Sequence, residues 1–273
     1  MAGRSFTFTH AIVRTPSAAM VRGLRAEDHG DPDFSTFCQH HTDYVAVLEA
    51  TGATVVTLPA LDAYPDSVFV EDAALCLPEG AVVMRPGAPT RLGEAAEMAP
   101  TLRELYDTVA EIKAPGFIEG GDILVTEREI LVGTSERTNA EGIAALAEIV
   151  EPWGHAVRTV QTPPGVLHFK TDCSLLAAET ILATERLAAS GCFEGYEIIH
   201  TCDGEEAAAN SIRFNDVVVM PEGFPETAAR VRDAGYSVKT IGNSEAAKLD
   251  GGMSCLSLRF TRSGLAPHLS VVQ

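Results

Sequence analysis

The chain has 273 residues, of which 46% are hydrophobic and 21% are charged, and its formal net charge is 20 − 38 = −18. These values are typical of a globular protein with a sizeable core, and the acidic charge argues against binding nucleic acid through a basic patch. No apolar run approaches the roughly 18 residues that a membrane-spanning helix needs, and the N-terminus lacks the apolar stretch of a signal peptide.

The cysteines suggest neither disulfides nor structural zinc. There are six, at positions 38, 76, 173, 192, 202 and 255, with no CxxC pair and no cysteine–histidine grouping of the zinc type. Because no export signal is visible, we expect reduced thiols and a cytoplasmic location. We interpret five of them as small buried hydrophobic residues and single out Cys255.

Strands and helices are expected in a recurring order along the chain. Residues 6–13 predict a first strand, and Phe37, His41, Tyr44 and Leu48 predict the helix that follows it. Five later segments begin with a small or acidic residue and continue with alternating apolar residues. They are residues 72–77, 122–125, 173–176, 211–214 and 255–258, at steps of 50, 51, 38 and 44 residues.

Most of these segments are followed by a second strand, a helix and a third strand. Second strands are predicted at 81–84, 129–132, 181–182 and 217–220, and third strands at 53–58 and 237–241. Helices are indicated by Leu102, Leu105, Tyr106 and Val109, by a capping box from Thr138 to Glu141, and by Pro225 ten residues before Gly235.

The repeated unit is therefore strand–strand–helix–strand, which predicts an α/β fold with a single domain over residues 1–273. The last unit has too little chain to complete itself, and the N-terminal strand and helix supply the missing parts. Closure in this way predicts a ring of five units without exposed sheet edges. The first residues of the five segments should then lie around one central pocket: Asp72, Asp122, Cys173, Ser211 and Cys255.

Cys255 and His168 are candidates for covalent and acid–base chemistry. A cysteine on a strand is commonly part of the core, but Gly251 and Gly252 precede Cys255 and suit the close approach of a ligand. A thiolate nucleophile needs a nearby positive group or donor. His168, expected on a strand after a turn at 162–165, would serve as general acid and base unless it is a core histidine.

Glu71, Asp72 and Glu119 place carboxylates at the same pocket. Clustered carboxylates are costly to bury unless a cation neutralises them. The chain lacks a histidine motif such as HExxH, so no metal is expected, whereas a planar guanidinium offers paired donors to two carboxylates. Arg91 and Arg137 lie on polar loops, where arginines are ordinarily surface residues. As a pair on corresponding loops they would hold a carboxylate, so the pocket suits an arginine-like amino acid.

Six motifs follow one another along the chain: DSVFVED at 66–72, RPGAP at 85–89, IEGGD at 118–122, VGTSERTN at 132–139, LHFK at 167–170 and GGMSC at 251–255. Together they resemble the motifs of the dimethylargininase (dimethylarginine dimethylaminohydrolase) family of the guanidine-modifying pentein superfamily. The similarity extends from Arg14 to Phe260. The resemblance implies a five-bladed α/β propeller and hydrolysis of Nω-methylated arginines to citrulline and an amine, without a cofactor.

The resemblance also implies residue roles. Cys255 is similar to the nucleophile, His168 to the proton donor and later base, and Glu119 to the carboxylate beside them. Positions that resemble substrate-binding residues are Glu71 and Asp72 for the guanidinium, Arg91 and Arg137 for the carboxylate, Asp66 for the α-amino end, Phe69 in the same motif, and Leu24 and Leu249 through backbone carbonyls.

Two other functions stay open at this point. An arginine or agmatine deiminase of the same superfamily would use the same chemistry with ammonia as the leaving group. A ribosome-binding initiation factor uses the same ring fold without catalysis, but it would not need a cysteine, a histidine and paired acids at the axis. The sequence is also compatible with a homodimer.

Overall fold

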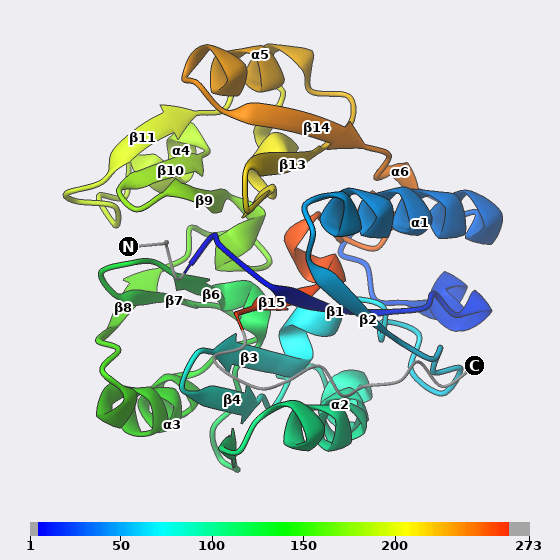
Figure 1. The fold of residues 1–273 in the computed structure, drawn as a ribbon, viewed down its shortest axis with the longest axis vertical. Helices are drawn as coiled ribbons and strands as arrows, with labels where there is room; N and C mark the ends of the chain where they lie inside the picture. Colours follow the sequence, from blue (N-terminus) through cyan, green and yellow to red (C-terminus); the bar gives the residue numbers. More distant parts are fainter. Residues whose placement is uncertain (1–4, 262–273) are drawn as a thin grey trace.

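The computed structural model describes residues 5–261 as five small sheets set around a common centre (Figure 1). In each sheet an inner strand pairs antiparallel with a middle strand, which pairs parallel with an outer strand. A helix connects the middle strand to the outer strand in every unit, and the longer helices lie on the outside of the ring. The predicted strand–strand–helix–strand repeat is confirmed.

The five sheets and their helices have the following bounds. The first contains β15 (Leu258–Phe260), β1 (His10–Arg14), α1 (Phe34–Ala50) and β2 (Thr54–Leu58). The second contains β3 (Ala74–Leu77), β4 (Gly80–Val83), α2 (Leu92–Leu105) and β5 (Val109–Glu111), and the third β6 (Ile123–Val125), β7 (Ile130–Thr134), α3 (Ala140–Val150) and β8 (Val157–Gln161). The fourth contains β9 (Cys173–Ala177), β10 (Thr180–Ala183), α4 (Glu185–Ala188) and β11 (Glu197–His200). The fifth contains β12 (Ile212–Phe214), β13 (Val217–Pro221), α5 (Pro225–Asp233) and β14 (Ser237–Ile241), and α6 (Ser244–Ala247) follows.

The N-terminal strand closes the ring, as predicted. β1 pairs with β15, with His10 opposite Phe260 and Ile12 opposite Leu258. The strand starts at His10 rather than at residue 6, because both main-chain groups of Phe8 are bound elsewhere. The Asn215 side chain accepts the Phe8 N–H at 2.7 Å and donates to the Phe8 carbonyl at 3.0 Å.

Buried apolar side chains fill the spaces between neighbouring units. Among the described residues they form one cluster for each of the five boundaries, including the boundary between the fifth unit and the N-terminal unit. Between the second and third units, for example, Leu77 packs in the same cluster as Ile118, Val132 and Leu146. Burial of apolar surface therefore holds each unit to the next and leaves the axis to polar residues.

Local signals set most helix boundaries. Phe37, His41, Tyr44 and Leu48 are the buried residues of α1, and the helix begins after Asp33, whose carboxylate accepts the Thr36 N–H at 2.7 Å. α5 begins at Pro225, as expected. Within residues 5–261, no helix combines the length and the apolar character needed to cross a membrane.

Two predicted helix boundaries were wrong. α3 is capped by Asn139, which accepts the Gly142 N–H at 2.8 Å, because the Thr138 hydroxyl is used by the Glu119 N–H at 3.2 Å. α2 ends at Leu105, and Val109 already belongs to β5, which its parallel pairing with β4 holds in place.

Candidate active site

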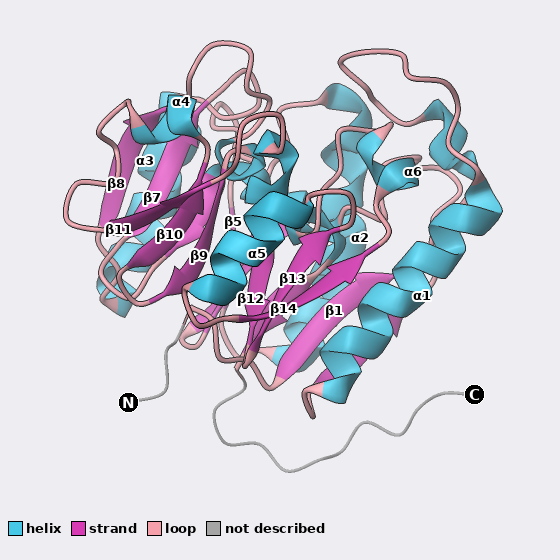
Figure 2. Cartoon of the chain, turned by 90° about the horizontal axis from the view of Figure 1, so that it is seen from above, coloured by secondary structure: helices cyan, strands magenta, loops and turns pink. Residues whose placement is uncertain are grey.

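A short 3-10 turn precedes every inner strand. The turns are η2 (Val70–Ala73), η4 (Gly120–Asp122), η6 (Phe169–Thr171), η7 (Glu206–Ala209) and η8 (Ser254–Leu256). They contact one another in the order η8, η2, η4, η6 and η7. Most long loops gather on one side of the sheets (Figure 2). Residues that are far apart in the sequence are thus brought side by side at the axis.

Cys255 lies in η8, just before β15 rather than on the strand. Its Sγ accepts the Gly252 N–H at 3.4 Å, and Asn210 Nδ2 lies 4.0 Å from Sγ. A Cβ on Gly252 would stand 2.2 Å from the Asn210 side chain, and one on Gly251 would stand 2.4 Å from the Phe69 ring. The glycine pair is therefore required for close packing of the protein around the thiol.

The surroundings of Cys255 disfavour its thiolate. Burial, followed by the negative charges of Glu71 and Asp72, raises the pKa of the Cys255 thiol to about 11. The Gly252 N–H and Lys170 oppose this rise. At neutral pH the thiol is thus protonated, and a further positive group beside it would favour the thiolate.

His168 and Glu119 form a buried ion pair. Nε2 of His168 lies 2.7 Å from Oε2 of Glu119. Burial disfavours the charged histidine, but Asp72, the hydrogen bond to Glu119 and Asp122 prevail and raise the pKa of His168 to about 9. Burial likewise disfavours the charged carboxylate, but the hydrogen bond and charge of His168 lower the pKa of Glu119 to about 2. At neutral pH the pair is an imidazolium and a carboxylate.

The predicted strand at His168 was wrong. His168 is the residue before η6, as Glu119 is the residue before η4. A Cβ on Gly121 would stand 2.8 Å from the His168 ring, so only glycine at this position allows the two turns to approach. The alternating apolar pattern at 166–169 comes from burial against the neighbouring turn and not from sheet pairing.

Asp72 is held by one backbone donor and one arginine. Its Oδ1 accepts the Gly121 N–H at 2.8 Å, and its Oδ2 pairs with Nη1 of Arg91 at 2.5 Å. Arg91 also donates to Glu94 at 2.8 Å and to the Phe69 carbonyl at 2.9 Å. Arg91 is buried, which differs from the polar loop expected, because α2 begins directly after it and carries Glu94.

Arg137 and Leu24 complete the polar wall of the site. Nη1 of Arg137 lies 3.4 Å from Oε1 of Glu119, and the Arg137 side chain is 20% exposed. The Leu24 N–H donates to Asp66 at 2.9 Å. Burial raises the pKa of Asp66. Of the two arginines predicted to bind a carboxylate, Arg137 therefore has a guanidinium with fewer partners within the protein.

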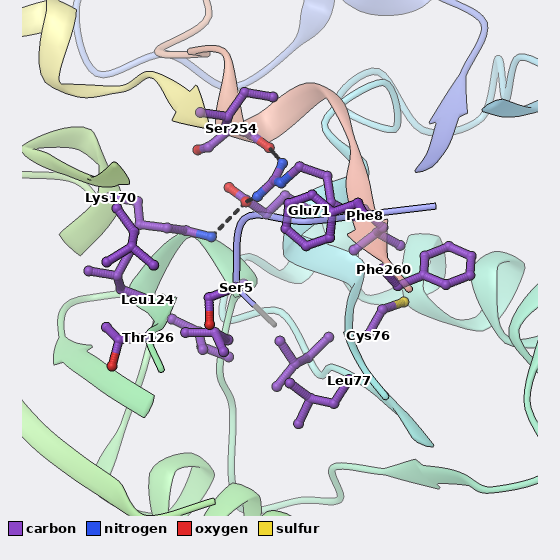
Figure 3. A pocket seen from close by; sticks show the side chains of 18 of the residues that line it. Ser5, Phe8, Glu71, Cys76, Leu77, Leu124, Thr126, Lys170, Ser254 and Phe260 are labelled. Atoms are coloured by element: carbon purple, nitrogen blue, oxygen red, sulfur yellow. Dashed lines mark hydrogen bonds and ion pairs between the residues drawn. The ribbon is translucent and has the colours of Figure 1, made fainter. Parts of the chain in front are cut away.

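Glu71 faces a different cavity. Its Oε1 accepts Lys170 Nζ at 2.6 Å and Arg259 Nη2 at 2.7 Å. Its Oε2 is buried without a hydrogen-bond partner among the described residues. Glu71, Lys170 and Arg259 line the larger of two cavities, shown in Figure 3 with Glu71 between Lys170 and Ser254.

The smaller cavity contains most of the predicted site. It is lined by nine of the eleven predicted residues: Leu24, Asp66, Phe69, Asp72, Arg91, Arg137, His168, Leu249 and Cys255. Glu119 bonds to His168 behind this lining, and Glu71 faces the larger cavity. Thiol, imidazole and carboxylates from distant segments therefore meet around one space.

The five repeat positions were expected to share one central pocket, but they do not. Asp72 and Cys255 line the smaller cavity, whereas Cys173 and Ser211 line the larger one. Asp122 lines neither, and its carboxylate binds Ser135 Oγ at 2.6 Å and the Phe169 N–H at 2.9 Å. Some of these positions lie within a 3-10 turn, and others lie at or just before the start of an inner strand. They therefore lie at different depths along the axis.

Sequence reasoning missed three residues close to Cys255. Asn210 ends η7 and accepts the Ser254 N–H at 3.0 Å, and Lys170 and Arg259 bind Glu71. Lys170 stands in the LHFK motif, and Arg259 directly follows the last repeat segment. A charged residue inside an otherwise apolar inner strand was the available signal for Arg259.

Asp72, Glu119 and His168 each offer a donor atom within 4.8 Å of the other two. Such a spacing is compatible with a metal ion. The positive charges of Arg91 and Arg137, which pair with these carboxylates, disfavour a metal cation there. The same three residues are accounted for by their ion pairs with one another and with the arginines.

Comparison with known proteins identifies the family. A family model described as N,N dimethylarginine dimethylhydrolase, eukaryotic, matches residues 29–185. The N(G),N(G)-dimethylarginine dimethylaminohydrolase of Pseudomonas aeruginosa is 38% identical over 254 residues, which cover 93% of this chain and 100% of that protein. This chain belongs to the dimethylarginine dimethylaminohydrolase family. The Streptomyces coelicolor protein of the same name is 31% identical over 253 residues, covering 91% of this chain and 96% of that one.

Solved structures confirm the predicted fold within this family and beyond it. The Pseudomonas aeruginosa dimethylarginine dimethylaminohydrolase, a cysteine-to-serine mutant complexed with citrulline, matches with a TM-score of 0.91 and 38% identity over 93% of this chain and all of that one. The N-terminal domain of ArgZ, a cyanobacterial arginine dihydrolase, matches with a TM-score of 0.81 at 19% identity, over 93% of this chain and 97% of that one, and shows the shared fold.

Proposed function

We propose that this protein hydrolyses Nω-methylated arginines, asymmetric dimethylarginine and monomethylarginine, to citrulline and dimethylamine or methylamine. The observation that carries the proposal is the cavity in which Cys255, His168 and Asp72 meet in a chain of this family. The relatives named above take their name from this reaction, and one solved relative is complexed with citrulline.

The substrate is oriented by charge. Its guanidinium lies beside Asp72, whose oxygens accept further hydrogen bonds, with the Glu119 carboxylate close by. Arg137 and Arg91 bind the α-carboxylate, and Asp66 with the backbone of Leu24 and Leu249 binds the α-amino end. Phe69 packs against the substrate between these polar groups. Agmatine lacks the α-carboxylate, so it would forgo the arginine contacts.

Carbon–sulfur bond formation starts the reaction. The substrate cation lowers the pKa of the neighbouring thiol, and the thiol proton leaves to solvent. The Cys255 thiolate then attacks the guanidinium carbon and forms a neutral tetrahedral adduct. Protonated His168 donates its proton to the methylated nitrogen, the carbon–nitrogen bond breaks, and the amine leaves. A positively charged thiouronium remains on Cys255.

Water completes the reaction. Neutral His168 takes a proton from water, and the hydroxide adds to the thiouronium carbon. The carbon–sulfur bond breaks, the thiolate is released, and loss of a proton to solvent leaves citrulline. No cofactor is required. His168 ends the cycle protonated, as its ion pair with Glu119 favours.

The experiment that tests the function compares four substrates side by side. Purified protein is given dimethylarginine, monomethylarginine, arginine and agmatine, and both citrulline-type product and released amine are quantified. We expect the methylated arginines to have the highest kcat/KM. Arginine or agmatine as the best substrate, with ammonia as the product, would instead identify a deiminase.

The rate should depend on pH through His168. Because its pKa is raised to about 9, the imidazolium that protonates the leaving amine is lost as the pH rises through that value. We expect kcat to fall above pH about 9. Glu119→Gln removes a negative charge beside the ring and should move this fall to lower pH by about one unit or more. Glu111→Gln, at an exposed carboxylate, is the matched control, and an unshifted Glu119→Gln profile would contradict the assignment.

Location and partners are part of the same proposal. The six cysteines are all unpaired thiols, which supports action in the reducing cytoplasm. The net charge of −18 favours a small cationic substrate over nucleic acid as the partner. A homodimer is compatible with this function, and sedimentation of the purified protein would establish its state.

A further inference from the structure

The side chains of Tyr44 and Arg259 bind the segment that carries Cys255. We call residues 253–257 the nucleophile turn. The buried Tyr44 hydroxyl donates to the Met253 carbonyl at 3.0 Å and lies 2.7 Å from Ser257 Oγ. Nη1 of Arg259 donates to two carbonyls of the same turn, those of Ser254 and Ser257, each at 2.8 Å. One arginine therefore binds the backbone on both sides of Cys255.

The same guanidinium also binds a carboxylate. Nη2 of Arg259 donates to Glu71 Oε1 at 2.7 Å, and Lys170 Nζ lies 2.6 Å from that oxygen. The three side chains are 15%, 4% and 10% exposed for Arg259, Glu71 and Lys170. One buried carboxylate thus stands between two cations, next to the nucleophile turn (Figure 3). In a poorly solvated setting these charges act strongly on their neighbours.

Glu71 is the carboxylate whose negative charge Arg259 and Lys170 offset. After burial, it is the largest contributor to the raised pKa of the Cys255 thiol, ahead of Asp72. Charged groups around the thiol come from each neighbouring turn: Glu71 and Asp72 from η2, Glu119 from the start of η4, His168 and Lys170 from η6, and Arg259 from β15. Removal of Arg259 would leave Glu71 with one cation and would free the two carbonyls of the turn.

We propose that Arg259 is a positioning residue for the nucleophile, which holds the nucleophile turn through the carbonyls of Ser254 and Ser257 and offsets the charge of Glu71 beneath Cys255. It acts on the reaction through Cys255 and does not contact the substrate, because it lines the larger cavity and not the smaller one. The inference rests on the proposed role of Cys255 as nucleophile.

The chain contains a matched control for this arginine. Arg213 is the middle residue of inner strand β12, as Arg259 is of β15, and both line the larger cavity. Arg213 donates to the carbonyls of Leu176 at 2.6 Å and Asn215 at 3.0 Å, and its guanidinium lies over the Phe6 ring. It is therefore a cation of the same cavity whose contacts lie away from the nucleophile turn.

The test measures alkylation of Cys255 in the substrate-free protein. Iodoacetamide is added over a range of pH, and modification of the Cys255 peptide is followed by mass spectrometry. At a fixed pH below the pKa of the thiol, Arg259→Gln should slow alkylation about tenfold, the equivalent of one pKa unit. Glu71→Gln should accelerate it, and the double variant should return toward wild type. Arg213→Gln should match wild type.

A second measurement separates position from charge. Arg259→Lys keeps the charge but cannot bind two carbonyls and a carboxylate together. With dimethylarginine we expect its kcat to fall about tenfold with little change in KM, whereas its alkylation profile stays closer to wild type than that of Arg259→Gln. Thermal unfolding followed by circular dichroism establishes that the variants are folded.

The outcomes distinguish this inference from the proposed function. Alkylation and kcat of Arg259→Gln equal to those of Arg213→Gln would overturn the role of Arg259. If Arg259→Gln does not fold, Arg259→Lys and Glu71→Gln decide by the directions given above. If wild type fails to turn over methylated arginines while the alkylation rates change as expected, the proposed function fails and the positioning of Cys255 stands.

Discussion

Replacing Cys255 by serine is expected to lower citrulline formation from dimethylarginine by at least about 10⁴-fold. Among residues 5–261 the hydrogen-bond partners of Cys255 Sγ are Gly252, Asn210 and Ser254, none of which is a base, and His168 is already protonated. The surrounding carboxylates that raise the pKa of the thiol would oppose an alkoxide far more strongly. Product formation is measured with purified protein under saturating substrate.

Cys38→Ser is the matched control for this substitution, because Cys38 is a half-buried thiol of α1 outside both cavities. Its activity should equal that of wild type. Mass spectrometry of wild type quenched during turnover should show an adduct on the Cys255 peptide, and the serine variant should show none. Citrulline production that survives in Cys255→Ser would reject the covalent mechanism.

Replacing His168 by alanine is expected to reduce turnover of dimethylarginine about a thousandfold, within the range for loss of a general acid and base. Both the departure of the amine and the activation of water should become slower, because the imidazole takes part in each step. A substrate analogue whose leaving group needs no proton should still react with Cys255. The covalent adduct should then accumulate, since its hydrolysis lacks a base.

The control for His168→Ala is His29→Ala, at an exposed histidine. Rapid quenching and mass spectrometry follow the adduct, and the amine and citrulline are quantified separately. Accumulation of the adduct with slow release of citrulline supports the two roles of His168. A variant with wild-type turnover would show that another group moves the protons.

The fold was largely predictable because its repeat is local. Each unit carries its own strand, strand, helix and strand, and the apolar periodicity of α1 or the Pro225 signal of α5 needs no information from elsewhere in the chain. The incomplete last unit at Cys255 also required a partner, and β1 met that requirement by pairing with β15. The start of β1 was not predictable, because Asn215, more than 200 residues away, binds Phe8.

The candidate site was predictable in residue types and only partly in geometry. The placement of Cys255, His168 and Asp72 around one cavity agrees with expectation. The strand expected at His168 is a loop and turn, and Arg91, expected on a polar loop as a carboxylate-binding residue, is a buried partner of Asp72 and Glu94. Apolar alternation reports burial, but it does not distinguish burial in a sheet from burial between turns.

The sequence alone determined the five-unit repeat, its closure by the N-terminal strand and the set of residues able to act on a guanidinium, because periodicity and residue chemistry are properties of short segments. Only the tertiary structure decided which charges meet. It paired Arg91 with Asp72 and Glu94, and it turned Glu71 toward Lys170 and Arg259. Such pairings depend on which turns are neighbours around the axis, and burial there makes each pairing large enough to set the pKa of the thiol and of the imidazole.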